Sequence, residues 1–279
     1  MKFKNYKNML GRPFLVFADL ESILKRMERQ QQTAEGEELN SRKVALHKPC
    51  AAAFYFVCTF DSSRNFYWEA VGENCVQEMI VELNSLAEKC IAEMRENARM
   101  VMTEEDRRAY RSTTCCHVCG LQGFTQRGGE MKVRDHDHRT GKFRGAAHSR
   151  CNINYFANRY LPVIFHNLRG YDSHHIIREA HKINKQIGQK DINAIPNSFE
   201  KFMSFSIGDL KFIDSFQFMS SSLEKLTENL YDEQDKFKNF HSVRQYFPDH
   251  LDVVCQGRAS SLTKGWILSR NSSTKGCHR

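Results

Sequence analysis

Four side chains of the kinds that bind zinc stand in two closely spaced pairs near the middle of this chain. The first pair forms a Cys-x2-Cys turn and the second follows after 28 intervening residues, as Cys116 and Cys119 and then His148 and Cys151. Two such pairs close a tetrahedral site, for which zinc is the usual occupant. The alternatives are two unrelated thiol turns, or a site that uses Cys115 and loses the two-residue gap. We expect residues 111–157 to fold as a zinc-bound module of their own.

The composition indicates a reducing setting for this module. Ten cysteines are spread over 279 residues, and the N-terminal MKFKNYKNML lacks the apolar segment of a secretory signal. No apolar run reaches the length of about 18 residues that a membrane-spanning helix needs. Clustered Cys and His in a reducing compartment indicate metal more often than disulfide. We expect an intracellular protein, nuclear if its source is eukaryotic, with no membrane partner.

The rest of the chain alternates between apolar runs of strand type and helical stripes. We expect strands at residues 14–18, 51–60 and from 66, a helix over 76–94, a strand at 161–165, a helix from 172, and a hairpin of 202–207 with 210–213. Three antiparallel strands followed by alternating helices and strands are typical of an α/β mixed sheet of ribonuclease H type. The cysteine block then interrupts this fold as an insertion after the first helix.

The expected domain order follows from this interruption. Residues 1–110 and 158–252 form two parts of one ribonuclease H-like domain, residues 111–157 form the insertion, and residues 253–279 form a tail. The tail contains no Asp or Glu, five Ser and no clear periodicity. We expect the tail to be disordered, or to be the product of a reading-frame or splicing change.

Acidic side chains end two of the predicted strands. Asp19 and Glu21 close the first apolar run, and Asp172 follows a later one. Carboxylates at i and i+2 of a strand point to the same face, with Leu20 turned into the core. Three carboxylates at neighbouring strand ends can hold two divalent metals, Mg²⁺ or Mn²⁺, against a phosphodiester. Asn167 is placed to orient a substrate or to hold its loop, and a nearby Tyr could position the attacking water.

Each of these residues also has an ordinary explanation. An Asp-x-Glu pair is frequent by chance, and an Asp that opens a helix is usually an N-cap. His174 and His175 follow Asp172 on the predicted helix, but exposed helix histidines are common, so we do not take them as ligands. The joint placement of the three carboxylates at adjacent strand ends of one sheet is what favours a metal site.

The cysteine block contains a second cluster of metal-type side chains. Asp135 and His136 stand between the two ligand pairs, and Asn152 follows the second pair. A His beside an Asp near a zinc-fixed hairpin is the usual composition of a one-metal nuclease site, in which the His activates water while the Asp and Asn hold Mg²⁺. The alternative is that the Asp and His brace the zinc fold.

Basic residues are concentrated in the same block. Residues 127–159 contain eight Lys and Arg against three Asp and Glu, within a chain of net charge +8. This excess suits contacts with nucleic-acid phosphates, and Lys142 and Arg144 are the side chains we expect to make them. The net charge alone is compatible with a polyanionic partner without establishing one.

Four segments resemble one polymerase family. PFLVFADLES resembles the first exonuclease motif of family B DNA polymerases, and FHNLRGYDSHHI resembles the second. FIDSFQFMSSSLEKL is similar to the segment that follows in the protein-primed branch. VRDHDHRTGKFRGAAHSRCN resembles the endonuclease VII-type HNH module inside polymerases of Maverick/Polinton elements. The resemblance covers roughly residues 12–252, and its motifs stand in the order of the family.

The resemblance implies a DNA-directed DNA polymerase with a 3′–5′ proofreading exonuclease, acting in replication of a mobile element. It implies that the ribonuclease H-like sheet is of the DnaQ 3′–5′ exonuclease type and that the zinc module is a small ββα-type HNH insertion. Its implied metal-binding carboxylates are Asp19, Glu21 and Asp172, with Asn167 and Tyr171 as accessory residues. Its implied zinc ligands are Cys116, Cys119, His148 and Cys151. Its implied endonuclease residues are Asp135, His136 and Asn152, and its implied contacts with single-stranded DNA are Ser222 and Leu223. The implied cofactors are structural Zn²⁺ and catalytic Mg²⁺ or Mn²⁺, and the implied partners are a single-stranded 3′ end, duplex DNA and a terminal priming protein.

The third exonuclease motif of the family, Tyr-x3-Asp, is missing from its expected place. It should follow the region of Tyr246 to Asp252, where the sequence instead turns into VVCQGRASSLTKGWILS. Tyr231 to Asp235 has the spacing in a different context, which we interpret as chance, and no polymerase motifs follow. We expect a truncated fragment without polymerase activity. Its exonuclease activity is in question, because the carboxylate of the third motif is missing. The alternatives are an HNH-type DNA endonuclease with the sheet as scaffold, or a non-catalytic DNA-binding remnant.

Overall fold

The computed structural model describes residues 10–26, 45–155, 159–198 and 201–251. The chain divides into two compact units, which are described separately. The cysteine unit comprises Met1–Phe14 and Leu86–Leu161, and the sheet unit comprises Leu15–Ser85 and Pro162–Arg279. No helix in the described part of the chain is long and apolar enough to cross a lipid bilayer. The predicted tail from Val253 onward lies outside the described residues.

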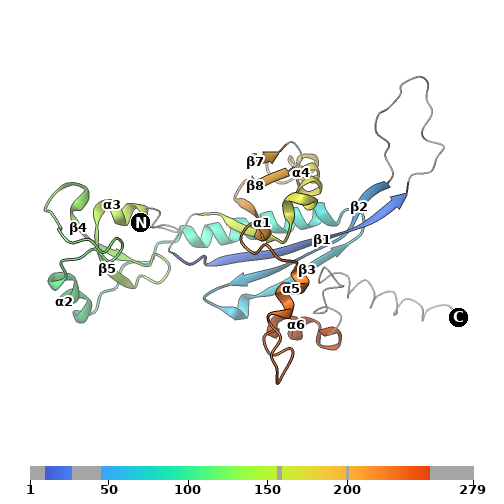
Figure 1. The fold of residues 1–279 in the computed structure, drawn as a ribbon. Coiled ribbons are helices and arrows are strands. Elements are labelled where there is room, and N and C mark those ends of the chain that lie inside the picture. Colours follow the sequence, from blue (N-terminus) through green and yellow to red (C-terminus); the bar gives the residue numbers. More distant parts are fainter. Residues whose placement is uncertain (1–9, 27–44, 156–158, 199–200, 252–279) are drawn as a thin grey trace. The chain divides into compact units, whose positions relative to one another are not determined.

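The sheet unit is built on one seven-stranded mixed sheet. Its strands lie in the order β3-β2-β1-β6-β9-β8-β7, with β1 parallel to β6 and with antiparallel pairs β2–β3, β7–β8 and β8–β9 (Figure 1). The strands are β1 Phe14–Arg26, β2 Ala45–Cys58, β3 Phe66–Val71, β6 Leu161–Phe165, β7 Ile192–Ser198, β8 Lys201–Ile207 and β9 Leu210–Asp214. The helices are α1 Cys75–Arg95, α4 Asp172–Ile183, α5 Leu223–Glu228 and α6 His241–Tyr246, with short 3-10 turns η3 Ser62–Arg64, η5 Leu168–Gly170, η6 Ser215–Gln217 and η7 Pro248–His250. The mixed α/β class predicted from the sequence is confirmed.

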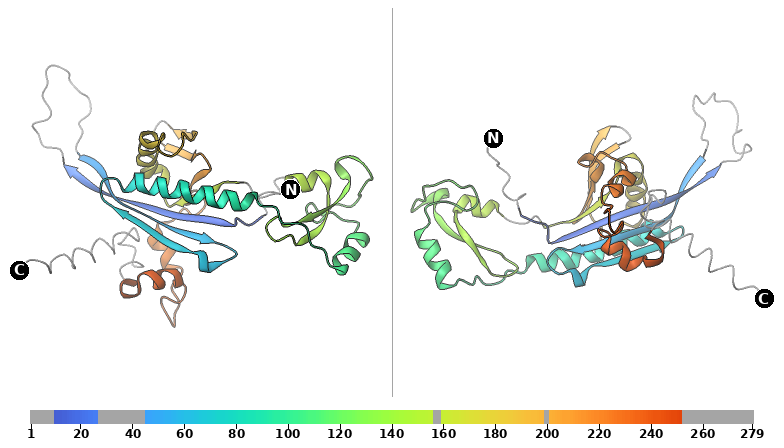
Figure 2. Two further views of the ribbon diagram at one scale, coloured as in Figure 1. Left: turned by 180° about the vertical axis from the view of Figure 1, so that it is seen from behind. Right: turned by 60° about the horizontal axis from the view of Figure 1, so that its bottom comes forward.

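Helix α1 lies on one face of the first three strands. The boundary between the two units falls within this helix, at Leu86. Phe54 of β2 is buried, and the Trp68 ring of β3 stacks on it with ring centroids 5.0 Å apart. Trp68 also lines a hollow together with Val81 of α1, which places the helix on this side of the sheet (Figure 2). The helical stripe predicted from the sequence is buried here, because its apolar residues recur at intervals of three and four.

The opposite face carries polar and aromatic side chains. Leu20 of β1 is buried, so its neighbours Asp19 and Glu21 point the other way, because side chains alternate along a strand. On β3, the Tyr67 ring packs beside Tyr246 of α6 at a centroid distance of 5.8 Å. The predicted carboxylates therefore lie on the face of the sheet that α6 partly covers.

The cysteine unit contains a two-stranded sheet followed by a short helix. Its elements are α2 Glu104–Ser112, η4 Gly128–Glu130, β4 Lys132–His136, β5 Phe143–His148 and α3 Ser149–Asn154. Strands β4 and β5 pair antiparallel, with a register shift between Asp135 and His136. Helix α2, for which the sequence analysis gave no prediction, starts with a capping box between Thr103 and Asp106. This unit contains the predicted insertion at residues 111–157 but begins before it, at Leu86.

Candidate functional site

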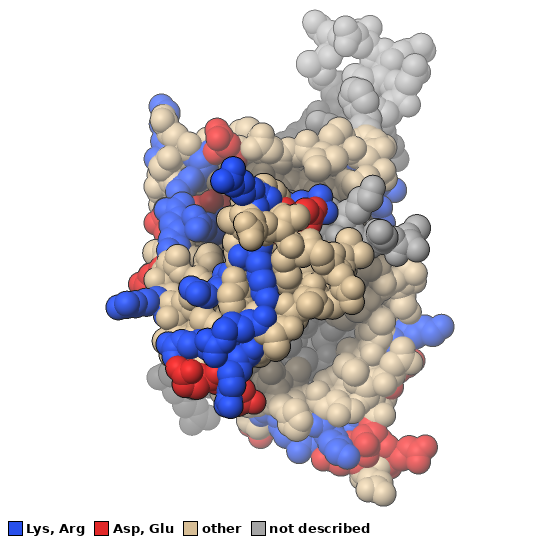
Figure 3. All heavy atoms as spheres, turned by 90° about the vertical axis from the view of Figure 1, so that its left-hand side faces the viewer, with Lys and Arg blue, Asp and Glu red and all other residues tan. Residues whose placement is uncertain are grey.

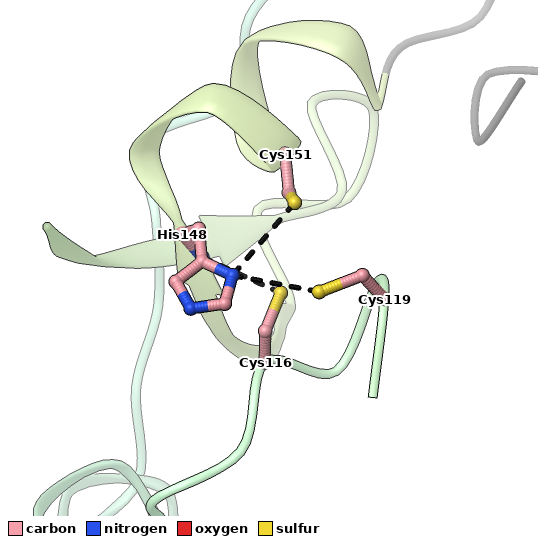
Figure 4. A group of neighbouring side chains, drawn as sticks. All are labelled: Cys116, Cys119, His148 and Cys151. Carbon is pink, nitrogen blue, oxygen red and sulfur yellow. Dashed lines mark hydrogen bonds between the residues drawn. The ribbon is translucent and has the colours of Figure 1, made fainter. Parts of the chain in front are cut away.

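The four predicted zinc ligands form one cluster in the cysteine unit. The ligand atoms of Cys116, Cys119, His148 and Cys151 all lie within 4.8 Å of one another. Nδ1 of His148 is 3.4 Å from the sulfur of Cys119 and 3.9 Å from that of Cys151. Figure 4 shows the three sulfur atoms and this nitrogen pointing toward a common centre. Three sulfurs and one imidazole nitrogen at this spacing fit a tetrahedral ion with bonds of about 2.0–2.3 Å, so the cluster can bind a metal such as zinc.

Local structure brings these ligands together from two short segments. Cys116 and Cys119 stand in a turn, whereas His148 ends β5 and Cys151 lies in α3. Cys116, Cys151 and His148 are buried. They pack in a small apolar core with buried Val118 and Ala147 and half-buried Phe124, Val133 and Tyr155.

Backbone hydrogen bonds prepare one of the thiols to be a ligand. Burial raises the pKa of Cys116, but hydrogen bonds from the N–H groups of Cys119, His148 and Val118 outweigh it, so the pKa of Cys116 is lowered. The pKa of Cys151 is raised to about 12, by burial and by the neighbouring Cys116. Because a bound cation stabilises thiolates, metal binding would be coupled to proton release from Cys151.

The remaining nitrogen of the ligand His148 faces a carboxylate. Its Nε2 atom is 3.2 Å from Oε2 of Glu130 in η4, and Glu130 also pairs with Nη2 of Arg150 at 2.5 Å. A metal-bound imidazole usually presents its second nitrogen to a carboxylate, which fixes the ring orientation. Glu130 was not predicted from the sequence, and its position in a Gly-Gly-Glu turn gives no distinctive signal.

The predicted endonuclease residue Asp135 is occupied by ion pairs. Its oxygens accept hydrogen bonds from Nε and Nη2 of Arg144, both at 2.8 Å, and Nε2 of His117 lies 2.9 Å from Oδ2. Burial raises the pKa of Asp135, but His117 and Arg144 outweigh it and lower the pKa. Asp135 thus connects the zinc-knuckle turn to the β4–β5 hairpin, which favours the bracing alternative. For Asp135 to bind Mg²⁺, its bonds to Arg144 and His117 would have to break. For Arg144 to bind a phosphate, its bonds to Asp135 would have to break.

The other predicted endonuclease residues lie nearby without forming a second ligand group. His136 on β4 and Asn152 on α3 are both half-buried, and the His136 ring is 4.8 Å from that of His138. Lys142 is exposed in the loop before β5. Among the described residues, the cysteine cluster is the single group of three or more Cys, His, Asp or Glu with ligand atoms close enough to share an ion.

The carboxylates predicted on the first strand lie within it, and not at its end. Strand β1 continues through Arg26, because apolar and long side chains carry the extended pattern past Asp19. The position is nevertheless close to the end of β6, since the parallel register pairs Phe17 with Ile164. This register brings the backbone around Asp19 near the segment that connects β6 to α4, and the charge of Glu21 acts on Asp172 at the start of α4.

Asp172, the third predicted carboxylate, opens α4 and is only 7% exposed. Burial raises its pKa to about 7, and the charges of Glu21 and Asp214 contribute to the rise. The ordinary structural explanation for Asp172 was that it caps the helix N-terminus. Tyr171 occupies the cap position instead, and no side chain makes a capping hydrogen bond. Within the described part of the chain, no hydrogen bond or ion pair reaches the Asp172 carboxylate. Glu21 and Asp172 thus come close enough for the charge of Glu21 to disfavour ionisation of Asp172.

A buried residue absent from the sequence prediction, Asp214, holds the loop before Asp172. It ends β9 with no exposed surface, and it accepts hydrogen bonds from the backbone N–H of Asn167 at 2.9 Å and of Arg169 at 3.3 Å. The Arg169 guanidinium lies 3.3 Å from the same carboxylate. Asn167 is in the left-handed region at φ 65°, which Asn tolerates better than most residues, and its side chain is exposed. Asp214 therefore positions the predicted substrate-facing Asn167.

Two tyrosines flank the carboxylates. The Tyr171 hydroxyl is 2.5 Å from Nδ1 of His47 on β2, and burial raises the pKa of Tyr171. Tyr67 donates a hydrogen bond of 3.0 Å to Glu69, and its pKa is raised by burial, by Glu69 and by Asp19. His47, Tyr67 and Glu69 were not predicted, because their alternation on the second and third strands gives the ordinary pattern of a sheet face.

The three carboxylates do not form a finished metal cage. Asp19, Glu21 and Asp172 are all described, yet their oxygens do not form one of the groups close enough to share an ion. Neighbouring carboxylates repel one another, which accounts for the difference from the predicted shared pocket. Of the predicted DNA contacts, Ser222 and Leu223 are exposed at the start of α5, where the Ser222 hydroxyl caps the helix by accepting from the N–H of Lys225 at 3.2 Å.

Comparisons with known proteins returned no match: no protein-family model, no curated protein and no solved structure matches this chain.

Proposed function

We propose that the sheet unit is a metal-dependent 3′–5′ exonuclease domain of the kind found in protein-primed family B DNA polymerases. Asp19, Glu21 and Asp172 would hold Mg²⁺ or Mn²⁺, and the substrate would be the 3′ end of single-stranded DNA. One observation carries the proposal, namely the buried Asp172 carboxylate, which has the Glu21 charge beside it and no cationic partner.

A purely structural role for Asp172 is physically unfavourable. A buried carboxylate is normally paired or hydrogen-bonded, because an unpaired charge away from water costs several kcal/mol. Here neighbouring carboxylates add repulsion, and no capping bond offsets it. A divalent cation between Glu21 and Asp172 would remove this cost. Unfavourable charge placement of this kind is common at catalytic sites.

The chemistry assigns distinct roles to the side chains around the carboxylates. Divalent metals, when bound, would activate water and absorb charge on the leaving oxygen. Asn167 is exposed and fixed by Asp214, so it can orient a phosphate or sugar. Tyr171 is held by His47 and can orient the attacking water. Phe17 is 45% exposed two residues before Asp19, where a terminal base could stack on it.

The cysteine unit has a structural role in this proposal. Zn²⁺ held by Cys116, Cys119, His148 and Cys151 would stabilise the small apolar core around it, since structural zinc sites are closed four-ligand sites. Ser222 and Leu223 would contact the single strand. By the same resemblance, DNA replication of a mobile element and a terminal priming protein are the proposed wider context.

The proposal is tested with 3′-end trimming of a 5′-labelled single-stranded oligonucleotide in Mg²⁺ or Mn²⁺. The wild-type protein should shorten the strand from its 3′ end, and Asp172→Asn should slow this by roughly a hundredfold or more, because the metals supply several kcal/mol of charge stabilisation. Glu78→Gln, on the exposed surface of α1, is the matched control and should keep full activity. Equal rates for wild type and Asp172→Asn, or no trimming by the wild type, would rule the proposal out.

A second candidate function is DNA nicking by the cysteine unit. It is favoured by one observation: the hairpin β4–β5 and helix α3 surround the cysteine cluster in ββα order, with His136 on the first strand. Nicking of duplex or branched DNA that is lost in His136→Ala and kept in Asp172→Asn would support this function. Absence of nicking would leave the exonuclease proposal unaffected.

A further inference from the structure

Three basic side chains of the cysteine unit lie where α2 meets β4. We call this the α2–β4 face; it consists of Arg111, Lys132 and Arg134. The two arginines are exposed and Lys132 is half-buried. In Figure 3, the surface turned toward the viewer shows more Lys and Arg than Asp and Glu.

Regular structure places these cations together. Arg111 lies in the last turn of α2, where its backbone oxygen is 3.5 Å from the ammonium nitrogen of Lys132. Lys132 and Arg134 are two residues apart on β4, so they share one side of the strand. The acidic residues of α2 are confined to its first turn, where they suit the helix dipole and leave the C-terminal half basic.

Tyr110 of α2 connects the helix to the strand. Its hydroxyl donates a hydrogen bond of 3.1 Å to the backbone oxygen of Lys132. The Lys132 ammonium lies 4.9 Å and the Arg134 guanidinium 5.2 Å from the centroid of the Tyr110 ring. Lys132 also donates to the backbone oxygen of Thr113 at 2.6 Å. Lys132 and Arg134 are therefore held in place by the Tyr110 ring and the end of α2, which lowers the entropy lost when they bind an anion.

The charge of this face is not neutralised within the protein. Among the described residues, no Asp or Glu forms an ion pair with Arg111, Lys132 or Arg134. The cations of the neighbouring loop differ in this respect. Arg144 pairs with Asp135, and the charges of Arg139 and Lys142 act on Asp137 and Asp106, whose pKa values are lowered by backbone hydrogen bonds and by these cations.

We propose that the α2–β4 face binds the phosphate backbone of duplex nucleic acid, without reading its sequence. Fixed and unpaired cations at one surface are the requirement for backbone binding. Proteins that bind single strands instead use exposed aromatic side chains, on which the bases stack. No Phe, Tyr or Trp is exposed among the described residues of the cysteine unit, and the Tyr110 ring is covered by two cations. The face therefore suits a double strand, and the proposal does not depend on nuclease activity in the sheet unit.

The test is the salt dependence of binding to a labelled duplex of arbitrary sequence, measured by fluorescence anisotropy with the zinc-loaded protein. The face variant is Arg111→Ala/Arg134→Ala. The matched control is Arg108→Ala/Arg139→Ala, which removes two exposed cations outside the face; Arg108 lies on the side of α2 away from Tyr110. Each lost phosphate contact lowers the slope of log affinity against log salt by about 0.9, so the face variant should lose between one and two. The control should change the slope by well under one, and zinc content should be equal in all three proteins.

The possible outcomes decide the proposal. A reduced slope in the face variant, equal for unrelated duplex sequences, supports it. It is overturned if the control loses as much slope as the face variant, if the wild type does not bind duplex at about 50 mM salt, or if single strands of equal length bind more tightly than duplex. Trimming by the sheet unit, measured in the same preparations, should be unchanged by the face variant on single strands, so failure here is distinct from failure of the exonuclease proposal.

Discussion

The two candidate metal sites of this protein are organised in opposite ways. In the cysteine unit, four ligand atoms already lie within 4.8 Å of one another, and backbone N–H groups and a small apolar core support them. In the sheet unit, the carboxylates are brought to one neighbourhood but stay apart, with Asp172 buried beside like charges. The four ligand atoms of the first site are already close enough to share an ion, whereas those of the three carboxylates are not.

This difference follows from the chemistry of the ligands. Thiols and imidazole are neutral before a metal binds, so they can pack together without repulsion, and their binding free energy adds to folding. Ionised carboxylates repel one another, so a site built from them costs stability until a cation arrives. Mutation of a stabilising cysteine site should unfold the cysteine unit. Mutation of a catalytic carboxylate site should remove activity and raise stability.

The largest expected effect is loss of the cysteine site. Cys151→Ser should abolish zinc binding and unfold the cysteine unit, because structural zinc contributes about 10–16 kcal/mol in small domains. Zinc content and circular dichroism measure this. Cys115→Ser is the control, since Cys115 lies outside the cluster, and it should keep zinc and structure. Equal zinc content in the two variants would contradict the assignment.

The next largest effect is a gain of stability in Asp172→Asn above neutral pH. A protonated Asp172 is favoured in the folded state, so its contribution to stability is fully present below pH 4 and is lost as pH rises through about 7. A rise of the pKa from 3.8 to about 7 corresponds to roughly 4 kcal/mol. Asp172→Asn should therefore unfold at higher denaturant concentration than wild type at pH 8, with the difference shrinking toward pH 5. A destabilised variant at pH 8 would mean that Asp172 has a structural partner.

A smaller effect is expected at the residue that holds the loop. Asp214→Asn should cost about 1–3 kcal/mol, because the buried charge-assisted bonds to the Asn167 and Arg169 N–H groups are weakened. Chemical denaturation measures the cost. If 3′ trimming is present, this variant should also slow it, since Asn167 loses its fixed position. Unchanged stability would show that the loop does not depend on Asp214.

The smallest effect is expected at the cap of α5. Ser222→Ala should cost about 1 kcal/mol or less, through loss of the bond from the Lys225 N–H. Ser222→Asp keeps a capping oxygen and adds a negative charge. If Ser222 also contacts single-stranded DNA, Ser222→Asp should weaken binding while leaving stability unchanged; parallel changes in both properties would leave only the capping role.

The sequence predicted the elements whose patterns are carried by apolar residues. Strand β6 has the predicted bounds, and the β8–β9 hairpin turns at Gly208, whose φ of 54° suits glycine. Helix α2 was missed because its nine residues are nearly all polar, although its capping box was readable. Strand β7 was missed because six of its seven residues are exposed, so no alternation marks it.

The candidate sites were predictable to different degrees for the same physical reason. Cysteine ligands are rare and their spacing is local, so the cluster followed from the sequence. Asp214, Glu69 and Glu130 depend on partners far apart in the chain or on ordinary-looking positions, and no local pattern marks them. The ion pairs that occupy Asp135 were also invisible, because Arg144 and His117 approach it only in the folded hairpin.

The most direct test of the central claim is Mn²⁺ binding to the zinc-loaded protein at pH 8, followed by calorimetry or electron paramagnetic resonance. We predict that the wild type binds Mn²⁺ and gains thermal stability, and that Asp172→Asn and Asp19→Asn lose this binding while Glu78→Gln retains it. Equal Mn²⁺ binding by wild type and Asp172→Asn, or no binding by any of them, would contradict the claim that these carboxylates form a site for a divalent metal.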